Sequence, residues 1–367
     1  MEFQRIVIKL GTSTLTAGTP RLSPPRIIEL VRQMATLHSS GRDILLVTSG
    51  AIAAGREWLN FPQLPKDIPI KQMLAAVGQP RLMALYEQLF GLYGITVGQV
   101  LLTRTDLAQR RGYLNARNSL AALLAQRVLP IINENDTVAT EEIRVGDNDN
   151  LSALVANLME ADLLVLLTDQ PGLFTADPRK DPAAQLIATV SGPEIPEALW
   201  QAAGGSGRLG TGGMATKLQA ADLARRSGLD VIIARGSDAD VLLRLVDGEA
   251  LGSRFQAVET AVESRKRYIL AGGRRRDCLV VDSGAVQALH GGGSLLPVGV
   301  VSVEGGFERG DPVRLQDQEG REIARGLVNY SAHDLKRIRG RHSSDIEKIL
   351  GYAYGEEVIH RNNLVLL

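Results

Sequence analysis

Two lysines, each next to a glycine-containing turn, are the side chains in this sequence best suited to contact a phosphorylated ligand. Lys9 ends a short apolar run and precedes Gly11, beside which backbone N–H groups can approach an anion closely. Lys217 follows a run of glycine and threonine and leads into a segment rich in alanine and leucine, where a helix would begin. The run lacks the spacing of a Walker A loop, and Lys9 alone also fits a strand-end lysine with a solvated head.

A stretch of small residues, 48–55, follows a second apolar run and leads into a segment of helical character. The free N–H groups and the dipole at a helix start favour negative charge, so this stretch suits a carboxylate or a phosphate. Small side chains are equally typical of a helix packed tightly on a sheet. The sequence leaves both interpretations open.

Polar residues gather in two further places. Residues 133–136 read Asn-Glu-Asn-Asp after an apolar run, and residues 146–150 read Gly-Asp-Asn-Asp-Asn before an apolar helix. Asp149 or Asn150 would be a good helix cap, but capping requires one such residue and four stand in line. The surplus indicates a role in binding a ligand.

These polar residues require a sheet that brings them to one edge. Apolar runs of four to six residues alternate with segments of helical periodicity through about Arg254, which predicts a three-layer αβα domain around a mainly parallel sheet. Such sheets bind ligands beyond the carboxyl ends of their strands, where Thr168 and Asp169 are also expected. The predicted strands are 6–10, 44–47, 97–102, 128–132, 163–167 and 231–234.

Length and composition set outer limits. The 367 residues exceed what one hydrophobic core usually organises, so two domains are expected. The 41 basic residues balance 41 acidic ones, which gives no overall field toward nucleic acid or an anionic membrane. Cys278 is the only cysteine, which excludes an intrachain disulfide and fits a reducing cytoplasm. We find neither a signal peptide nor an apolar run long enough to span a membrane.

The sequence changes character near Ser264. Basic triplets at 265–267 and 274–276 flank a glycine pair, and short strand-like runs with dense glycine follow. The expected strands of this second domain are 280–282, 298–303, 312–315, 323–328 and 358–359. The predicted division of the chain is an α/β domain over 1–258, a linker over 259–276 and a small β-rich domain over 277–367.

Together, these motifs resemble those of the amino acid kinase family. The resemblance covers nearly the whole chain and rests on five ordered segments, 9–13, 48–55, 133–136, 146–152 and 210–217. The C-terminal segment looks like the PUA domain that bacterial members of the family often carry. It has Gly-Ser-Leu-Leu-Pro at 293–297 and Gly-Gly-Phe-Glu-Arg-Gly-Asp at 305–311.

The resemblance implies a reaction and the residues that perform it. The side-chain carboxylate of L-glutamate would attack the terminal phosphorus of ATP to give an acyl phosphate, the first step of proline synthesis. By similarity, Lys9 and Lys217 would stabilise the transition state, and Asp149 would hold their ammonium groups. The matching substrate-binding residues are Ser49, Asp136 and Asn148. Those of the nucleotide site are Lys9, Thr168, Asp169, Thr211, Gly212, Gly213, Met214, Ala215, Thr216 and Lys217.

Cofactors and partners follow from the same resemblance. Mg²⁺ would be held mainly by the phosphates of ATP and by water, so no side chain is assigned to the metal. The resemblance also implies feedback inhibition by proline and assembly into dimers or tetramers. A hand-off of the labile product to glutamyl phosphate reductase is a further expectation.

Two other interpretations stay open. A kinase that acts on N-acetylglutamate or aspartate would share the phosphoryl-transfer residues, although the C-terminal domain weighs against it. A regulator that binds RNA through the β-rich domain, with the kinase-like part as a sensor, belongs to a different class. Residues 264–367 hold 16 basic and 13 acidic side chains, a net charge of +3, which is a thin basis for binding RNA.

Overall fold

The computed structural model describes residues 3–65, 67–139, 148–204, 213–258 and 277–367. These residues form two compact units. The predicted linker, 259–276, lies outside the described residues. In the described part of the chain, no helix has the length and apolar character needed to cross a membrane.

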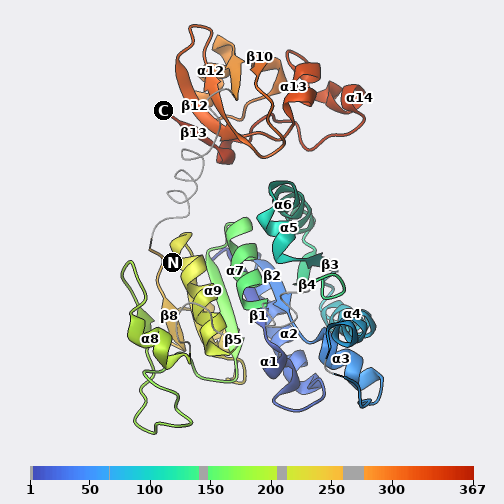
Figure 1. The fold of residues 1–367 in the computed structure, drawn as a ribbon, viewed down its shortest axis with the longest axis vertical. Coiled ribbons are helices and arrows are strands. Elements are labelled where there is room, and N and C mark those ends of the chain that lie inside the picture. The colour runs from blue at the N-terminus through green and yellow to red at the C-terminus, as the bar shows by residue number, and fades with distance from the viewer. Residues whose placement is uncertain (1–2, 66, 140–147, 205–212, 259–276) are drawn as a thin grey trace. The chain divides into compact units, whose positions relative to one another are not determined.

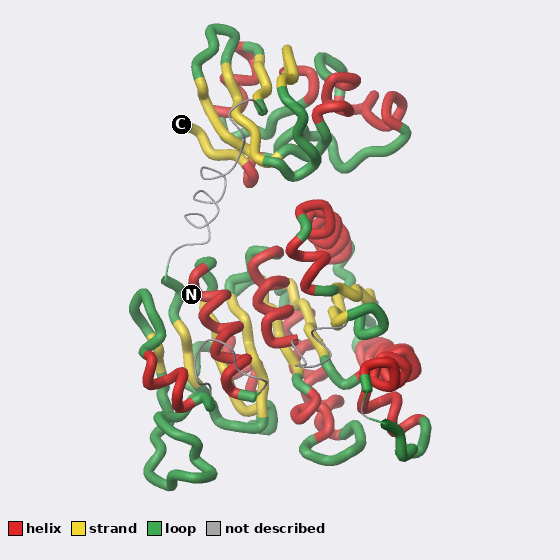
Figure 2. Tube along the Cα trace, viewed as in Figure 1, coloured by secondary structure: helices red, strands yellow, loops and turns green. Residues whose placement is uncertain are grey.

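The first unit contains one eight-stranded sheet with helices on both faces (Figures 1 and 2), which confirms the predicted αβα architecture. Its strands are β1 (Arg5–Leu10), β2 (Asp43–Thr48), β3 (Val97–Leu102), β4 (Leu129–Glu134), β5 (Leu163–Thr168), β6 (Thr189–Val190), β7 (Asp230–Arg235) and β8 (Ser253–Phe255). The order across the sheet is β3-β4-β2-β1-β5-β7-β8-β6, and β8 runs antiparallel to β7. All six predicted strands are present, whereas the short strands β6 and β8 were not predicted.

Two helices of this unit begin at recognisable sequence signals. Its helices are α1 (Thr12–Thr16), α2 (Pro24–Ser39), α3 (Ala51–Trp58), α4 (Ile68–Gly91), α5 (Arg104–Ala108), α6 (Arg110–Ala125), α7 (Asn148–Leu158), α8 (Glu197–Ala202), α9 (Met214–Arg226) and α10 (Val241–Val246). Proline occupies the first turn of α2, and the Asp67 side chain caps α4 by accepting from Ile70 N.

Alternation along β1 assigns its side chains to two different layers. Ile6, Ile8 and Leu10 belong to a core shared with α2, α4 and α10. Lys9 lies between two of these residues in sequence and therefore points to the opposite face of the sheet. Helix α7 packs against β1 on the sheet. This parity determines which helix Lys9 can reach.

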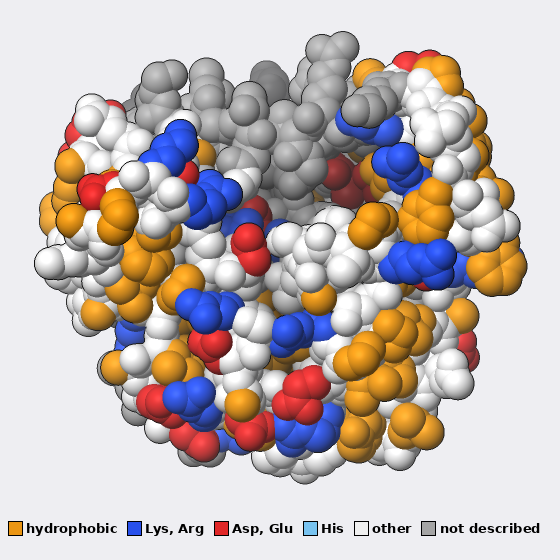
Figure 3. Space-filling model, turned by 90° about the horizontal axis from the view of Figure 1, so that it is seen from below, with side chains coloured by type: hydrophobic (Ala, Val, Ile, Leu, Met, Phe, Trp, Pro, Cys, Tyr) orange, Lys and Arg blue, Asp and Glu red, His pale blue; other side chains and the backbone are white. Residues whose placement is uncertain are grey.

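The carboxyl ends of the parallel strands point in one direction. Helix α1 follows β1 directly and lies at the lower end of the sheet in Figure 1, so these ends face downward there. Figure 3 views the molecule from below and shows basic and acidic side chains interspersed on that face. The mixture agrees with the balanced charge of the whole sequence.

The second unit is a five-stranded sheet in the order β10-β9-β11-β12-β13, with three α-helices among its described residues. Its elements are β9 (Cys278–Val281), α12 (Ser283–His290), β10 (Val300–Glu304), β11 (Pro312–Gln316), β12 (Glu322–Leu327), α13 (Ala332–Ile338), α14 (Ile346–Leu350) and β13 (Leu364–Leu366), with 3₁₀ turns η2 (Pro297–Gly299), η3 (Ser343–Asp345) and η4 (Arg361–Asn363). Most neighbouring strands are antiparallel, and β11 runs parallel to β9.

One predicted strand of this unit, 358–359, is wrong. Ile359 makes only an isolated bridge to Leu295, and the edge strand is β13. Val358 and Ile359 are fully buried, so their apolar character serves the core and not a sheet ladder. The other four predicted strands of the unit overlap observed ones.

Candidate active site

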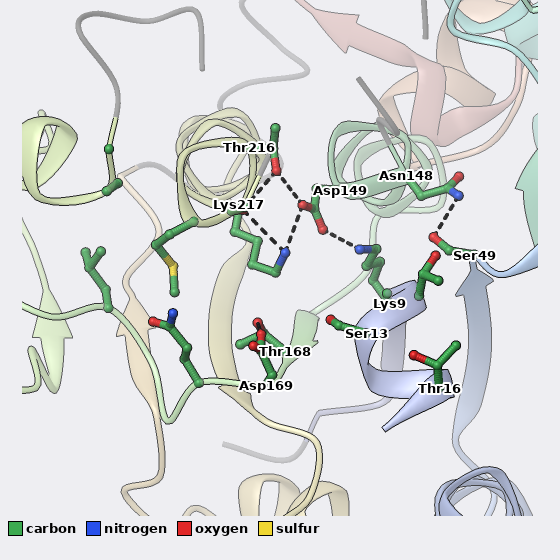
Figure 4. Close-up of a pocket in the computed structure, with 18 of the residues that line it drawn as sticks. Lys9, Ser13, Thr16, Ser49, Asn148, Asp149, Thr168, Asp169, Thr216 and Lys217 are labelled. Atoms are coloured by element: carbon green, nitrogen blue, oxygen red, sulfur yellow. Dashed lines mark hydrogen bonds and ion pairs between the residues drawn. The ribbon is translucent and has the colours of Figure 1, made fainter. Parts of the chain in front are cut away.

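Most polar residues singled out in the sequence line one cavity of about 1550 Å³ beyond the carboxyl ends of β1, β2, β4 and β5. Pockets that hold one small molecule usually measure about 300–1,000 Å³, so this cavity has room for two substrates. Figure 4 shows its central residues. The sheet therefore brings together side chains that are far apart in the sequence.

Asp149 lies between Lys9 and Lys217 in this cavity (Figure 4). Lys9 Nζ is 2.7 Å from Asp149 Oδ1, and Lys217 Nζ donates to Asp149 Oδ2 at 3.2 Å. The Thr216 hydroxyl donates to the same Oδ2 at 2.7 Å. The side chains of Lys9 and Asp149 are 5% and 4% exposed. We call Lys9, Asp149 and Lys217 the ion triad; it fixes two ammonium groups at the cavity wall.

The charge state of the ion triad follows from its contacts. Burial alone would raise the pKa of Asp149, because it penalises the charged form. The ammonium groups of Lys9 and Lys217, with hydrogen bonds from Lys9 and Thr216, outweigh burial and hold the pKa of Asp149 well below its usual range. Asp149 is therefore ionised at neutral pH and has little tendency to accept a proton. With two ammonium groups and one carboxylate, the ion triad keeps a net positive charge that suits an anionic ligand.

Three elements assemble the ion triad. The parity of β1 directs Lys9 to the face opposite its apolar core residues. Helix α7 begins at Asn148, so Asp149 lies in its first turn and faces the lysines; the interpretation of Asp149 as a helix cap is wrong. Helix α9 begins at Met214, which puts Thr216 and Lys217 near its start.

A second polar cluster lies beyond Lys9. Asn148 Nδ2 donates to Ser49 Oγ at 2.9 Å and to Asn133 Oδ1 at 3.0 Å. Asn133 Nδ2 in turn donates to Gln79 Oε1 at 2.8 Å. Ser49 and Asn148 were both predicted from the sequence, and the structure brings them into contact (Figure 4). Asn148 Oδ1 is buried and has no hydrogen-bond partner among the described residues.

Asp136 lines the same cavity, and its carboxyl group is in the opposite state to that of Asp149. Burial raises the pKa of Asp136 to about 6. No cation appears among the causes of this shift, so within the described residues nothing compensates for the burial. A carboxylate in this state gains the most from a cationic ligand.

The predicted nucleotide residues are found at the other end of the cavity. Thr168 is the last residue of β5 and Asp169 follows it, and the Thr168 hydroxyl donates to Asp169 Oδ1 at 3.0 Å. Gly213, Met214, Thr216 and Lys217 line the cavity, whereas Ala215 is buried and is not among its lining residues. Thr211 and Gly212 lie outside the described residues, as do positions 146 and 147 of the polar run before α7.

Sequence reasoning missed part of the cavity wall. Residues 173–180 and 201–204 also line the cavity, and they were not predicted. Two adjacent basic residues, Arg179 and Lys180, were the available signal in the first segment. Asn133 belonged to a predicted motif but was not singled out, and nothing in the helical sequence around Gln79 marks it as a site residue.

The small residues 48–55 turn out to have two roles. Ser49 and Gly50 line the cavity, as the ligand interpretation requires. A Cβ at Gly55 would lie 2.0 Å from Leu74 O, and one at Gly78 would lie 1.8 Å from Ala51 O. Helices α3 and α4 therefore meet backbone to backbone. The packing interpretation was correct in kind, but the partner of α3 in this contact is another helix and not the sheet.

Comparison with known proteins supports the resemblance. A sequence model of the amino acid kinase family matches residues 4–235, and one of the PUA domain matches residues 278–350. Curated relatives that match nearly the whole chain bear the name glutamate 5-kinase, and three of them illustrate the similarity. That of Photobacterium profundum is 57% identical over 99% of this chain and 96% of its own length. Those of Shewanella amazonensis and Aliivibrio fischeri are both 56% identical over 100% of this chain, and over 96% and 99% of their own lengths.

Proposed function

The chain is a kinase that belongs to the amino acid kinase family, and we propose that it transfers the γ-phosphoryl group of ATP to the side-chain carboxylate of L-glutamate. Relatives that match almost its full length are named glutamate 5-kinase. The proposal is carried by one observation: two different polar clusters lie side by side in one cavity. The ion triad suits the phosphate chain, and the cluster around Asn148 suits an amino acid.

The proposed reaction depends on electrostatics and alignment. A carboxylate is a nucleophile at neutral pH, so one of its oxygens forms a bond to the γ-phosphorus while the bond from that phosphorus to the ADP oxygen breaks. Repulsion between two anions opposes this approach. We assign Lys9 and Lys217 to stabilising the negative charge of the transferring group. Asp149 holds both ammonium groups, and its low pKa supports this role because such a carboxylate is a poor general base.

The nucleotide would occupy the end of the cavity formed by Thr168, Asp169 and the start of α9. Gly213, at φ 76°, precedes α9, and the helix start offers free backbone N–H groups to a phosphate. The positive net charge of the ion triad supports the same placement. We also assign Thr216 a positioning role: its hydroxyl donates to Asp149 and so helps to hold that carboxylate in place.

Mg²⁺ would accompany ATP and neutralise part of the phosphate charge. Within the described residues, no group of three or more His, Cys, Asp or Glu side chains is arranged to hold a metal ion. Both oxygens of Asp149 face the lysines and Thr216. We therefore propose that phosphate oxygens and water hold the ion, and we assign no side chain to it.

The acceptor would occupy the end of the cavity formed by Ser49, Asp136 and Asn148. Ser49 Oγ accepts from Asn148, so its own hydroxyl hydrogen can be donated to a carboxylate of the substrate. Asn148 Oδ1 and the Asp136 carboxylate are acceptors that suit an ammonium group. This pattern favours a free amino acid over N-acetylglutamate, whose nitrogen carries no charge.

A trapping assay tests the proposal. Hydroxylamine converts an acyl phosphate to a hydroxamate, so the protein is incubated with ATP, Mg²⁺ and hydroxylamine plus glutamate, aspartate or N-acetylglutamate. We expect hydroxamate from glutamate in clear excess over the other two acids. A preference for aspartate or N-acetylglutamate would overturn the substrate assignment, and no product from any acid would overturn the reaction.

Further properties are proposed on the family relation alone. They are feedback inhibition by proline, assembly into dimers or tetramers, action in the cytoplasm and a hand-off of the product to glutamyl phosphate reductase. Steady-state assays with proline, sedimentation of the full chain and coupled assays with the reductase test the inhibition, the assembly and the hand-off in turn.

A further inference from the structure

We propose that Gln79, on α4, is a positioning residue that anchors the groups which recognise the acceptor. Gln79 begins a series of hydrogen bonds through Asn133 to Asn148, which we call the amide relay, and Asn148 ends it on Ser49. Asn133, Asn148 and Ser49 line the cavity, whereas Gln79 is not among its described lining residues. The inference rests on the proposed function, because it concerns how the acceptor is held.

The direction of each hydrogen bond in the amide relay is fixed by the backbone. The N–H of Glu134 donates to Asn133 Oδ1 at 2.9 Å, so that atom must be the amide oxygen. The amino group of Asn133 then faces Gln79, which must present its oxygen at 2.8 Å. Asn148 also donates to Asn133 Oδ1, so its amino group points inward to the relay.

This direction has a consequence for the two groups at the far end. Because the amino group of Asn148 is engaged by Asn133 and Ser49, its oxygen is left as an acceptor. Because Ser49 Oγ accepts, its hydroxyl is left as a donor. If Asn133 rotated, Asn148 could turn its amide over and both properties would be lost. Gln79, which accepts from the amino group of Asn133, opposes that rotation together with the N–H of Glu134, which donates to Asn133 Oδ1.

The amide nitrogen of Gln79 contributes nothing to this arrangement. Nε2 is buried and has no hydrogen-bond partner among the described residues. A buried amide with one unsatisfied donor costs stability, and such a group usually has a reason to be retained. Here the oxygen alone is used, which predicts that a side chain with a similar shape and an acceptor in the same place will suffice.

Both ends of the amide relay are attached to the same helix crossing. Gly78 precedes Gln79 on α4, and a Cβ added at Gly78 would lie only 1.8 Å from Ala51 O. Ala51 begins α3, two positions after Ser49. The backbone contact between α3 and α4 therefore holds Gln79 at a fixed distance from Ser49, and the relay spans that distance through side chains.

The test uses two substitutions of Gln79. If Gln79 only fills space, Gln79→Met should be the milder change; if it positions Asn133, Gln79→Glu should be the milder one. Gln79→Met keeps the length and apolar stem but removes the acceptor. Gln79→Glu keeps an acceptor in the same place and replaces the unpartnered nitrogen with an oxygen, which also introduces an ionisable carboxyl group. Gln88→Met, at an exposed position on the same helix, is the matched control. KM for glutamate, KM for ATP and kcat are measured for each full-length protein in the hydroxamate assay, with thermal unfolding as a check on folding.

We expect Gln79→Met to raise KM for glutamate roughly tenfold, with KM for ATP within about twofold of the wild type, as loss of one buried hydrogen bond would do. Gln79→Glu should stay within about threefold for both substrates, and Gln88→Met should change nothing. The inference is overturned if Gln79→Met behaves as the wild type, or if Gln79→Glu raises KM for glutamate as much as Gln79→Met does. It is also overturned if Gln79→Met raises KM for ATP as much as KM for glutamate.

Failure of the inference is distinct from failure of the proposed function. A wild-type protein that makes no hydroxamate from glutamate contradicts the function. The same variants are then compared on the acid that the protein does phosphorylate, with the same ranking expected. A wild-type protein active on glutamate with an unaffected Gln79→Met variant contradicts only the role of Gln79.

Discussion

The two ends of the cavity treat their carboxylates in opposite ways. Asp149 contacts two ammonium groups and a hydroxyl, and its pKa is held well below the usual range. Asp136, in the same cavity, has no such compensation among the described residues, and burial raises its pKa to about 6. The end assigned to phosphoryl transfer is thus complete without a ligand. The end assigned to the acceptor leaves a charge and an amide oxygen to be satisfied by one.

The difference indicates a division of labour. Groups that must be rigid at the moment of reaction are stabilised by one another, which costs no reorganisation when the substrates arrive. Groups that must discriminate between acids gain from being unsatisfied, since a wrong ligand leaves them buried and unpaired.

Removing one ammonium group from the complete end should have the largest effect. Lys217→Ala is expected to lower kcat about 10²–10³-fold, with a smaller effect on KM for glutamate, because a charge that stabilises the transition state is lost. The hydroxamate assay measures both constants. Arg226→Ala, on the exposed side of the same helix, is the control. A Lys217→Ala variant with normal kcat would remove the lysine from the mechanism.

Neutralising the central carboxylate should destabilise the fold. Asp149→Asn leaves two buried ammonium groups without their counter-ion, and we expect the free energy of unfolding at pH 7 to fall by about 3 kcal/mol. The folded-state pKa of Asp149 lies below its unfolded value, so its contribution is full above pH ~4 and is lost as pH falls further. Urea unfolding at pH 7 and at about pH 3.5 should show the gap between variant and wild type narrowing with acid. A gap independent of pH would contradict the ionic account.

The incomplete end should give the opposite result for stability. Asp136→Asn removes a carboxylate whose pKa is about 6 in the folded chain, above its unfolded value. Ionisation of Asp136 therefore destabilises the fold as pH rises through about 4 to 6, and the variant should be more stable by about 1–2 kcal/mol at pH 7. KM for glutamate should rise about 10–100-fold at the same time, because the ammonium partner is lost. An Asp136→Asn variant that is less stable than the wild type and has an unchanged KM for glutamate would contradict the proposed difference between Asp136 and Asp149.

The pH dependence of binding should show the smallest effect. The ammonium group of glutamate would bind the ionised form of Asp136, and protonation of Asp136 removes that partner. KM for glutamate should therefore increase as pH falls below about 6, by up to about tenfold per pH unit. Asp136→Asn should lack this dependence, which separates it from titration of ATP or of other groups. Equal slopes for the two proteins would assign the titration elsewhere.

Much of this site could be predicted because its residues follow strand ends. Lys9, Ser49 and Thr168 each come directly after or at the end of an apolar run, and a parallel sheet brings such positions to one edge. Asn148 and Asp149 were found through a surplus of polar residues that capping did not explain. Their assigned roles came from the family resemblance and stay proposals.

Other features had no local signal in the sequence. Gln79 lies inside a long helix, 54 positions from Asn133, and its role depends on a contact that no periodicity reveals. The short strands β6 and β13 have two and three residues, too few for an alternation to be recognised. The glycines at 55 and 78 were visible, but only the crossing of α3 and α4 shows which backbones they bring together.

The close crossing of α3 and α4 also bears on the order in which the site assembles during folding. The two helices follow one another in the chain, so their contact closes a short loop and has a low entropic barrier. The bond between Lys217 and Asp149 joins residues 68 positions apart and must await the sheet. A refolding chain would therefore acquire the α3–α4 crossing before the ion triad and before the amide relay, whose bond between Asn148 and Ser49 joins residues 99 positions apart. Partly folded molecules that hold only the crossing would lack phosphoryl-transfer activity.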